Sequence, residues 1–544
     1  MRERQHQRTA SPQFMVIGID GATFDVMSPW MKAGELPSLR RLMEEGAHGE
    51  LTSTTPPNSA AAWTSFMTGK NPGKHGVFDF FEPVTNSYAV RHTNGTSRQA
   101  KTIWRILSES GKRVGIMGVP MTYPPEEVLG YLIAGLDTPD ERSQFIYPPA
   151  LQHELARKFG RIETIVYHFP QKLGKSYRSA LGAYELWESL EERRARLCQY
   201  LMRTRPTDLV MIHFFAVDQI QHYFWHYMDE THPLHDSEGA HLLGGLIKQI
   251  YRKIDDLVGE LLAALPRETS VIVLSDHGAG PLRSQPKSVN KFLASLGLLK
   301  FKSADRPTPR LSGVAHRALQ QVDAFVRQRL PPRVKTLITR AFPGTRDTFE
   351  SYIATGEIDW SGTKAYCAGK FSPAIWINLK GVRPHGIVAP GAEHEELLAF
   401  ITKKLYEIKD PGTGAQMIPR IRRKEEIYSG PYLSNAPDLL IDSWLDLSPH
   451  PSQRTGQHLA GSTIIGRTPM EESVGKKTAS HRYNGILLLR GEPFKAGQPL
   501  RGAQIIDLAP TILHLMGVPV PDDMDGRVLK EALKDECPAR IPVT

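Results

Sequence analysis

Short apolar runs alternate along the chain with amphipathic stretches. The run FMVIGID at 14–20 predicts a buried strand that delivers Asp20 at its C-terminal end. Further apolar runs predict more strands, and stretches with helical spacing lie between them; the strands are expected at 111–120, 130–135, 207–215 and 268–278, and the helices at 37–46, 102–111 and 246–265. This alternation indicates an α/β fold with a mostly parallel sheet covered by helices on both faces.

Two longer stretches, at about 145–200 and 300–470, break the alternation and are rich in proline and charge. We interpret them as insertions on one domain that spans 14–544. The stretch 502–529 returns to an amphipathic helix followed by a proline-rich loop. Residues 1–13 are basic and polar without the apolar core of a signal peptide, so we expect a short disordered leader there.

Composition fits a globular protein, with 40% hydrophobic and 23% charged residues among 544. No apolar run approaches the ~20 residues that cross a bilayer. The three cysteines form no C-x-x-C pair, which argues against a disulfide framework or a thiolate metal site. We therefore expect a cytoplasmic protein.

The net charge of +9 is concentrated in one segment. Residues 300–346 hold eleven basic residues against two acidic ones, an excess equal to the charge of the whole chain. A solvated basic helix is the simpler interpretation, and peripheral contact with an anionic membrane is the alternative. We expect no specific nucleic acid partner, and the pattern does not indicate an oligomeric state.

Candidate metal ligands follow several of the expected strands. Asp20, Asp218 and Asp276 each lie within a few residues of an apolar run, and ligands of parallel sheets collect at the carboxyl ends of strands. Asp218 and His222 are four residues apart in a helical stretch, so they share one face. His277 follows Asp276 directly, before a glycine that we expect to supply a turn.

His481 precedes another strand-like run and completes the set. Taken singly, each of these residues has a structural interpretation, such as a surface Asp–His pair or an exposed histidine. Together, three aspartates and three histidines form two mixed oxygen and nitrogen sites that suit Zn²⁺ or Mn²⁺. Two such ions can stabilise the attacking and leaving oxygens of a phosphoryl displacement.

The stretch TTPPNSAAAWTSFMTGKNPGKHG at 54–76 carries six hydroxyl side chains. The run after PPN predicts a helix that starts at Ser59 and ends at Gly69. Ser59 is either the N-cap of this helix or a nucleophile that faces a phosphate at the helix N-terminus. GKNPGK does not match a P-loop, because only three residues separate Gly69 from the second Gly-Lys and His75 replaces the required Ser or Thr.

These residues, in this order, resemble the type I phosphodiesterase/nucleotide pyrophosphatase family of the alkaline phosphatase superfamily, in its prokaryotic soluble branch. The resemblance covers nearly all of the chain after residue 13, through VIGIDGATFD, PPNSAAAWTSFMTGKNPGKHGVFDF, VPMTYPPEEVLGYLIAG, VDQIQHYFW, SDHGAG, SHRYNGILLLRG and DLAPTILHLMGVPVPDDMDG. It implies an alkaline phosphatase-like three-layer α/β/α sandwich with inserted cap regions.

The resemblance also implies a mechanism and a ligand set. Ser59, nine residues before Thr68, would be the nucleophile that forms a covalent phosphoseryl enzyme, which water then hydrolyses. One ion would be bound by Asp20, Asp276, His277 and the oxygen of Ser59, and the other by Asp218, His222 and His481. The ions are expected to be Zn²⁺, with Mn²⁺ as the alternative, and the substrate a small phosphate ester.

Two features depart from the family pattern. Nucleotide pyrophosphatases carry an asparagine shortly after the His-Gly pair that contacts the phosphate, whereas this chain has Asp79–Phe80 near that place. The basic segment 300–346 has no counterpart in that pattern. The alternatives to a phosphodiesterase or nucleotide pyrophosphatase are a cofactor-independent phosphomutase and a non-catalytic binding protein on the same fold.

Overall fold

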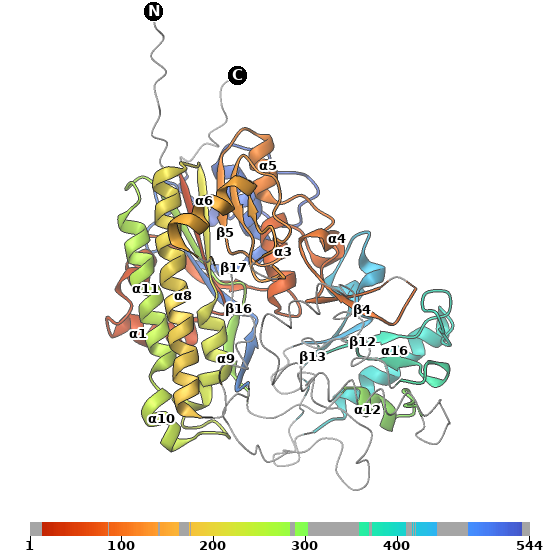
Figure 1. The fold of residues 1–544 in the computed structure, drawn as a ribbon. Helices are drawn as coiled ribbons and strands as arrows, with labels where there is room; N and C mark the ends of the chain where they lie inside the picture. Colours follow the sequence, from red (N-terminus) through yellow and green to blue (C-terminus); the bar gives the residue numbers. More distant parts are fainter. Residues whose placement is uncertain are drawn as a thin grey trace, which may run out of the picture.

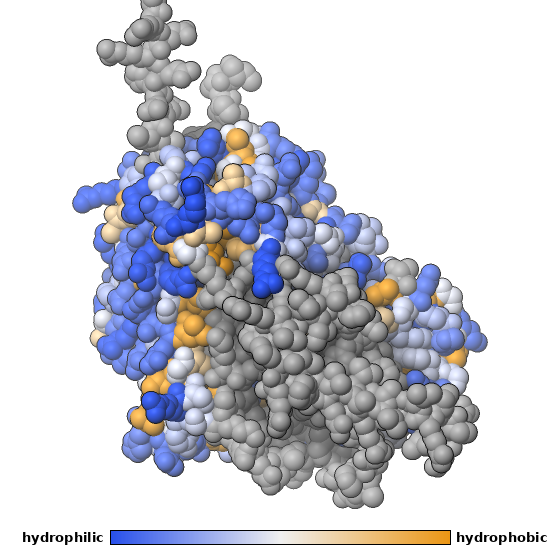
Figure 2. All heavy atoms as spheres, viewed as in Figure 1, coloured by the Kyte–Doolittle hydropathy of each residue, from blue (hydrophilic) through white to orange (hydrophobic). Residues whose placement is uncertain are grey.

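The computed structural model describes residues 13–535 except for 85, 140–141, 161, 163–172, 174–175, 283–288, 303–357, 369–372, 410–415, 417, 419 and 443–476. The expected leader and most of the basic segment 300–346 lie outside the described residues. Among those described, no helix is both long and apolar enough to span a bilayer. Figure 2 shows that the described surface on this face is mostly hydrophilic, with scattered hydrophobic residues.

A nine-stranded sheet forms the centre of the part of the chain that the structure describes (Figure 1). Five of its eight strand pairings are parallel, so the expectation of a mostly parallel sheet is confirmed. In spatial order the strands are β17 (Pro499–Gln504), β2 (Ala47–Thr52), β16 (Asn484–Arg490), β9 (Ser270–Leu274), β1 (Phe14–Ile19), β8 (Leu209–Phe214), β5 (Val114–Met117), β6 (Gly130–Ile133) and β7 (Ile146–Tyr147).

Helices cover both faces of this sheet, which gives the three layers that the sequence predicts (Figure 1). One layer contains α2 (Pro37–Glu45), α8 (Tyr177–Thr204), α9 (Ala216–Met228) and α11 (Leu246–Ala263). The other contains α3 (Ser59–Thr68), α5 (Ile103–Glu109) and α18 (Leu508–Leu515). The stretch 145–200, expected as an insertion, supplies β7 to the sheet edge and α8 to a helical layer.

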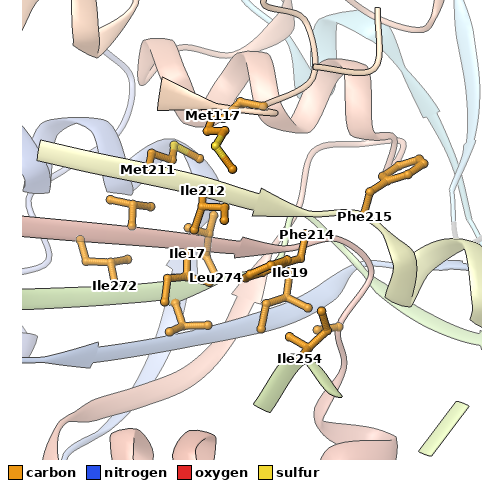
Figure 3. Packing of buried hydrophobic residues seen from close by; sticks show 14 of the residues in the cluster. Ile17, Ile19, Met117, Met211, Ile212, Phe214, Phe215, Ile254, Ile272 and Leu274 are labelled. Carbon is orange, nitrogen blue, oxygen red and sulfur yellow. The ribbon is translucent and has the colours of Figure 1, made fainter. Parts of the chain in front are cut away.

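The central strands are apolar on both sides because both faces are covered (Figure 3). Every residue of β1 and β8 is buried. Ile17, Ile212 and Leu274 pack from neighbouring strands, and Ile254 of α11 contributes to the same core. This rigid core fixes the positions at which β1, β8 and β9 end, and those ends carry the candidate ligands.

A second hydrophobic core takes most of its residues from the stretch 300–470, which was expected as an insertion, and others from 289–299 and from Val90. A four-stranded sheet in the order β11-β12-β14-β13 packs with α12 (Val289–Ser295) and α16 (Ala392–Tyr406). These strands are β11 (Ala365–Tyr366), β12 (Ala374–Ile377), β14 (Leu439–Asp442) and β13 (Arg420–Arg423). The region lies beside the main body near α4 (Pro72–His75) (Figure 1).

Candidate active site and metal centre

Asp20 directly follows β1 and is completely buried. Its Oδ2 accepts hydrogen bonds from Trp63 Nε1 at 3.2 Å and from His213 Nε2 at 3.0 Å. Its Oδ1 is buried and has no hydrogen-bond partner. The carboxylate is therefore oriented by one oxygen while the other is left to face the neighbouring Asp276 and His277.

Asp276 and His277 occupy a bend between β9 and β10 (Gly278–Pro281). With Asp20 they form one group whose potential ligand atoms all lie within 4.8 Å of one another. Gly278 does not have the positive φ that a turn glycine would need. It is needed for space instead, because a Cβ there would lie 2.2 Å from the carbonyl oxygen of Asn484.

A second group within the same 4.8 Å limit contains Asp218, His222 and His481. Asp218 and His222 lie one turn apart on α9, as their spacing predicts. His481 lies in β15 (Ala479–Arg482), which pairs antiparallel with β10 and places His481 opposite Ala279. The rings of His277 and His481 are stacked with centroids 3.7 Å apart, so the two groups are neighbours.

The hydrogen bonds of the three histidines leave each Nε2 with a lone pair directed at the site. The Nδ1 atoms donate to backbone oxygens: His222 to Ala479 at 2.7 Å, His481 to Pro57 at 2.8 Å, and His277 to Gly278 at 3.0 Å. Consequently the Nε2 atoms of His222 and His481 face each other at 3.0 Å without a proton between them. Two facing lone pairs repel unless a cation lies between them.

The electrostatics of the site agree with a cation centre. Burial, together with the charges of Asp276 and Asp218, raises the pKa of Asp20 well above its usual range. Burial also raises the pKa of Asp276, whose Oδ2 has no hydrogen-bond partner. Burial lowers the pKa of His222 and His481 well below the usual value. Buried, unpaired carboxylate oxygens beside neutral imidazoles are a donor set that divalent metal ions fit.

Ser59 is the first residue of α3, but it is not the cap of that helix. Asn58 is the N-cap, and its Oδ1 accepts from the backbone N–H groups of Ala60 at 2.9 Å and Ala61 at 3.3 Å. The hydroxyl of Ser59 is therefore not used for capping; it hydrogen-bonds the Asp276 carboxylate, and its Oγ lies 3.1 Å from His277 Nε2. Of the two interpretations that the sequence left open, the capping role belongs to Asn58.

Other hydroxyls of the same stretch have structural partners. Thr64 and Thr68 donate to carbonyl oxygens one turn earlier in α3, at 2.6 and 2.7 Å. Ser65 Oγ lies 2.9 Å from His75 Nε2, and the Nδ1 of His75 accepts from the backbone N–H of Val77. His75 is thus a buried, fully bonded core histidine and takes no part in the site.

The glycine- and lysine-rich turn after α3 is held by the C-terminal part of the chain. Lys70 pairs with Asp523, and Lys74 pairs with Asp525 at 2.6 Å. Asp525 also accepts from both the backbone and the side-chain nitrogen of Asn71 at 2.8 Å. The motifs GKNPGK and PDDMDG therefore hold each other in place, and their lysines and aspartates form structural ion pairs.

Several residues that orient the site were missed from the sequence. His213 and Trp63 hold Asp20, and a Cβ at Gly18 would lie 2.6 Å from the Trp63 ring, so this glycine makes room for it. His213 occurs inside an apolar strand, which is the signal that could have identified it. Asp79, at the position that departs from the family pattern, accepts from Asn58 Nδ2 at 2.7 Å and so orients the cap beside Ser59.

The fold and the site define an α/β protein with two Asp/His groups, suited to divalent ions, around a serine at the start of a helix. The chain belongs to the type I phosphodiesterase / nucleotide pyrophosphatase family, whose model matches residues 14–441. The resemblance found in the sequence is thereby confirmed.

Solved structures and curated proteins give further similarities. Phosphonoacetate hydrolase from Sinorhizobium meliloti 1021, solved with phosphonoformate, is 13% identical over 92% of this chain and 94% of that chain, with a TM-score of 0.51. Murine ectonucleotide pyrophosphatase/phosphodiesterase 5 is 13% identical over 94% of this chain and 96% of that chain, with a TM-score of 0.49. The first of these likenesses supports the fold alone.

Among curated proteins the similarity is local. A 2,3-bisphosphoglycerate-independent phosphoglycerate mutase of Cereibacter sphaeroides is 42% identical over 66 residues, which is 12% of this chain and 13% of the mutase. The corresponding mutase of Rhodopirellula baltica is 44% identical over 61 residues, 11% of each chain. The matched part is thus a small fraction of the length of these relatives.

Proposed function

We propose that the protein is a metal-dependent phosphohydrolase that cleaves phosphodiester, nucleotide pyrophosphate or related phosphate ester bonds of small molecules, with Ser59 as its nucleophile. The observation that carries this proposal is the hydroxyl of Ser59, which is freed from capping by Asn58 and lies 3.1 Å from His277 Nε2. Membership of the phosphodiesterase family supports the reaction class.

The two ligand groups would each hold one divalent ion, with Zn²⁺ favoured and Mn²⁺ as the alternative. When bound, the ions would supply positive charge that stabilises the attacking and leaving oxygens. Asp20, Asp276 and His277 would form the site next to Ser59, whose oxygen is a proposed fourth ligand there. Asp218, His222 and His481 would form the other site.

The residues of the chain then act as follows. Ser59 Oγ attacks phosphorus and loses its proton to solvent, the bond from phosphorus to the leaving oxygen breaks, and the leaving group takes a proton from water. A second water attacks phosphorus of the phosphoseryl intermediate, the bond from phosphorus to Ser59 Oγ breaks, the phosphate product leaves, and Oγ regains a proton. The N-terminal dipole of α3 favours the anionic phosphate. The N–H groups of Ala60 and Ala61 already bond Asn58, so contacts from them to the phosphate are not part of the proposal.

The first test is an assay against bis-p-nitrophenyl phosphate and p-nitrophenyl phosphate, after chelation and re-addition of Zn²⁺ or Mn²⁺. We expect Ser59→Ala to lower metal-dependent kcat by at least about a thousandfold, as removal of a nucleophile does. Ser65→Ala, which removes a buried hydroxyl from the same helix, is the matched control and should retain activity. Equal activity of Ser59→Ala and wild type would exclude Ser59 as the nucleophile.

The local similarity to phosphoglycerate mutases favours one alternative, a phosphomutase that returns the phosphoryl group to a sugar acid. Incubation with a phosphorylated sugar acid distinguishes the two, because a mutase yields its isomer and a hydrolase releases free phosphate. A non-catalytic binding protein is less well supported, since the aspartate and histidine positions of both groups are filled by competent ligands. Membrane contact through 300–346 is tested separately, by sedimentation with anionic vesicles with and without that segment.

A further inference from the structure

Thr478 lies directly beside the candidate ligand group of Asp218, His222 and His481. It is completely buried and immediately precedes β15, the strand that carries His481. Its backbone N–H donates to the carbonyl oxygen of His222 at 2.6 Å. One residue further on, the carbonyl of Ala479 accepts from His222 Nδ1 at 2.7 Å. The two bonds align β15 with α9 at His222, the residue whose Nε2 faces that of His481.

Two further histidines hold Thr478 in this position. His232 Nδ1 accepts from the backbone N–H of Leu234, so its Nε2 carries the proton that is donated to the carbonyl oxygen of Thr478 at 3.0 Å. The hydroxyl of Thr478 donates to the carbonyl of His222 at 3.4 Å and accepts from His226 Nδ1 at 3.1 Å. Both histidines are buried. Every polar group of Thr478 therefore binds α9 or the turn that follows it, and its carbonyl also accepts from the backbone N–H of Leu282, next to β10, at 2.8 Å.

We propose that Thr478 and His226 are positioning residues that lock β15 onto α9 and so set the spacing of His222 and His481 for binding the second metal ion. The need for a lock follows from the chain: His222 and His481 are 259 residues apart, yet their Nε2 atoms lie 3.0 Å from each other. A shift of β15 by a fraction of an ångström would spoil the geometry of that ligand pair, and partners of metal ligands commonly contribute 10- to 100-fold in affinity. The inference rests on the proposed metal-dependent function.

The test measures metal binding and does not depend on activity. Chelator-stripped protein is titrated calorimetrically with Zn²⁺ and with Mn²⁺, and bound metal is counted by elemental analysis. His481→Ala and Asp20→Asn identify which binding step belongs to which ligand group. We expect Thr478→Val and His226→Leu to weaken the step lost in His481→Ala by about tenfold, and to leave the other step within about twofold. Thr478→Ser and His226→Asn, which keep the hydrogen-bonding atoms, should bind nearly as wild type.

Thr511→Val is the matched control for loss of a buried threonine hydroxyl. Thr511 is also fully buried, and its Oγ1 donates to the carbonyl of Asp507 at 2.6 Å in the opposite helical layer. Unchanged binding in both Thr478→Val and His226→Leu, or an equal loss of both steps, would overturn the lock. If wild type binds no ion, the metal-dependent function fails with it; if wild type binds two ions and both variants bind them with the same affinities as wild type, the lock alone fails. Should Thr478→Val fail to fold, His226→Leu with its Asn rescue decides.

Discussion

At the scale of single residues, histidines have different roles according to which ring nitrogen carries the proton. His222, His277 and His481 donate from Nδ1 to backbone carbonyls and present Nε2 to the site. In His75 both ring nitrogens have hydrogen-bond partners, the backbone N–H of Val77 at Nδ1 and the hydroxyl of Ser65 at Nε2. The tautomer therefore separates these three histidines from His75, because His75 accepts at Nδ1 and carries its proton on Nε2.

His75 gives a pH-dependent prediction. Burial lowers its pKa to about 3, below the unfolded value of 6.5, so the folded state binds fewer protons. Its stabilising contribution is complete above pH 6.5 and is lost as the pH falls toward 3. We expect the stability difference between wild type and His75→Gln to shrink by up to about 1.4 kcal/mol per pH unit in that window. Urea unfolding of both metal-free proteins at several pH values measures this; parallel curves would contradict it.

At the scale of elements, α9 carries two of the candidate ligands but starts without a cap of its own, because Phe215 offers no side-chain acceptor. Glu191 of α8 provides the acceptor instead. Its Oε1 accepts from the N–H groups of Phe215 and Ala216, each at 2.7 Å, and the carboxylate also pairs with the buried Arg194 at 3.2 Å. The helix that holds Asp218 and His222 is thus fixed by a neighbouring helix.

Removal of this acceptor should be costly. Glu191→Ala leaves two N–H groups and the Arg194 guanidinium without their partner, so we expect a loss of about 3 kcal/mol or more in the free energy of unfolding. Glu191→Gln keeps an acceptor oxygen and should lose less. Glu192→Ala, the adjacent and partly exposed residue on α8, is the control and should change stability by no more than about 1 kcal/mol. Chemical denaturation compares the three, and equal losses at 191 and 192 would refute the cap.

At the scale of the whole molecule, the candidate ligands come from parts of the chain that meet only in the fold. The end of β1, the bend after β9, the helix α9 and the strand β15 all contribute to the two groups. An ion bound there would link the central sheet to a helical layer. Metal binding is therefore expected to be coupled to the stability of the folded state.

Chelation should accordingly lower the melting temperature, and re-addition of Zn²⁺ or Mn²⁺ should restore it. An ion present at one hundred times its dissociation constant stabilises the folded state by about 2.7 kcal/mol per site. Differential scanning fluorimetry with and without chelator measures the shift. His481→Ala should keep part of it because Asp20, Asp276 and His277 remain, and Ser59→Ala should keep most of it. Identical melting with and without chelator would contradict a resident metal.

The sequence by itself determined the layered α/β architecture and the identity of the candidate ligands. Buried parallel strands are apolar throughout, so FMVIGID and the other apolar runs could be recognised as strands from the sequence. The acidic residues at their ends could be recognised in the same way. The family motifs pointed to Ser59 and to both groups of ligands before any geometry was known.

Only the tertiary structure decided how those residues are held. That Glu191 caps α9 and that Thr478 registers β15 against α9 both depend on contacts between segments whose pairing no local pattern encodes. The same holds for Gly278, which is needed because the backbone of Asn484 comes too close for a side chain, and not because of a turn. Hydrogen bonds between distant segments depend on how the whole chain packs, whereas periodicity and spacing record only what each segment buries.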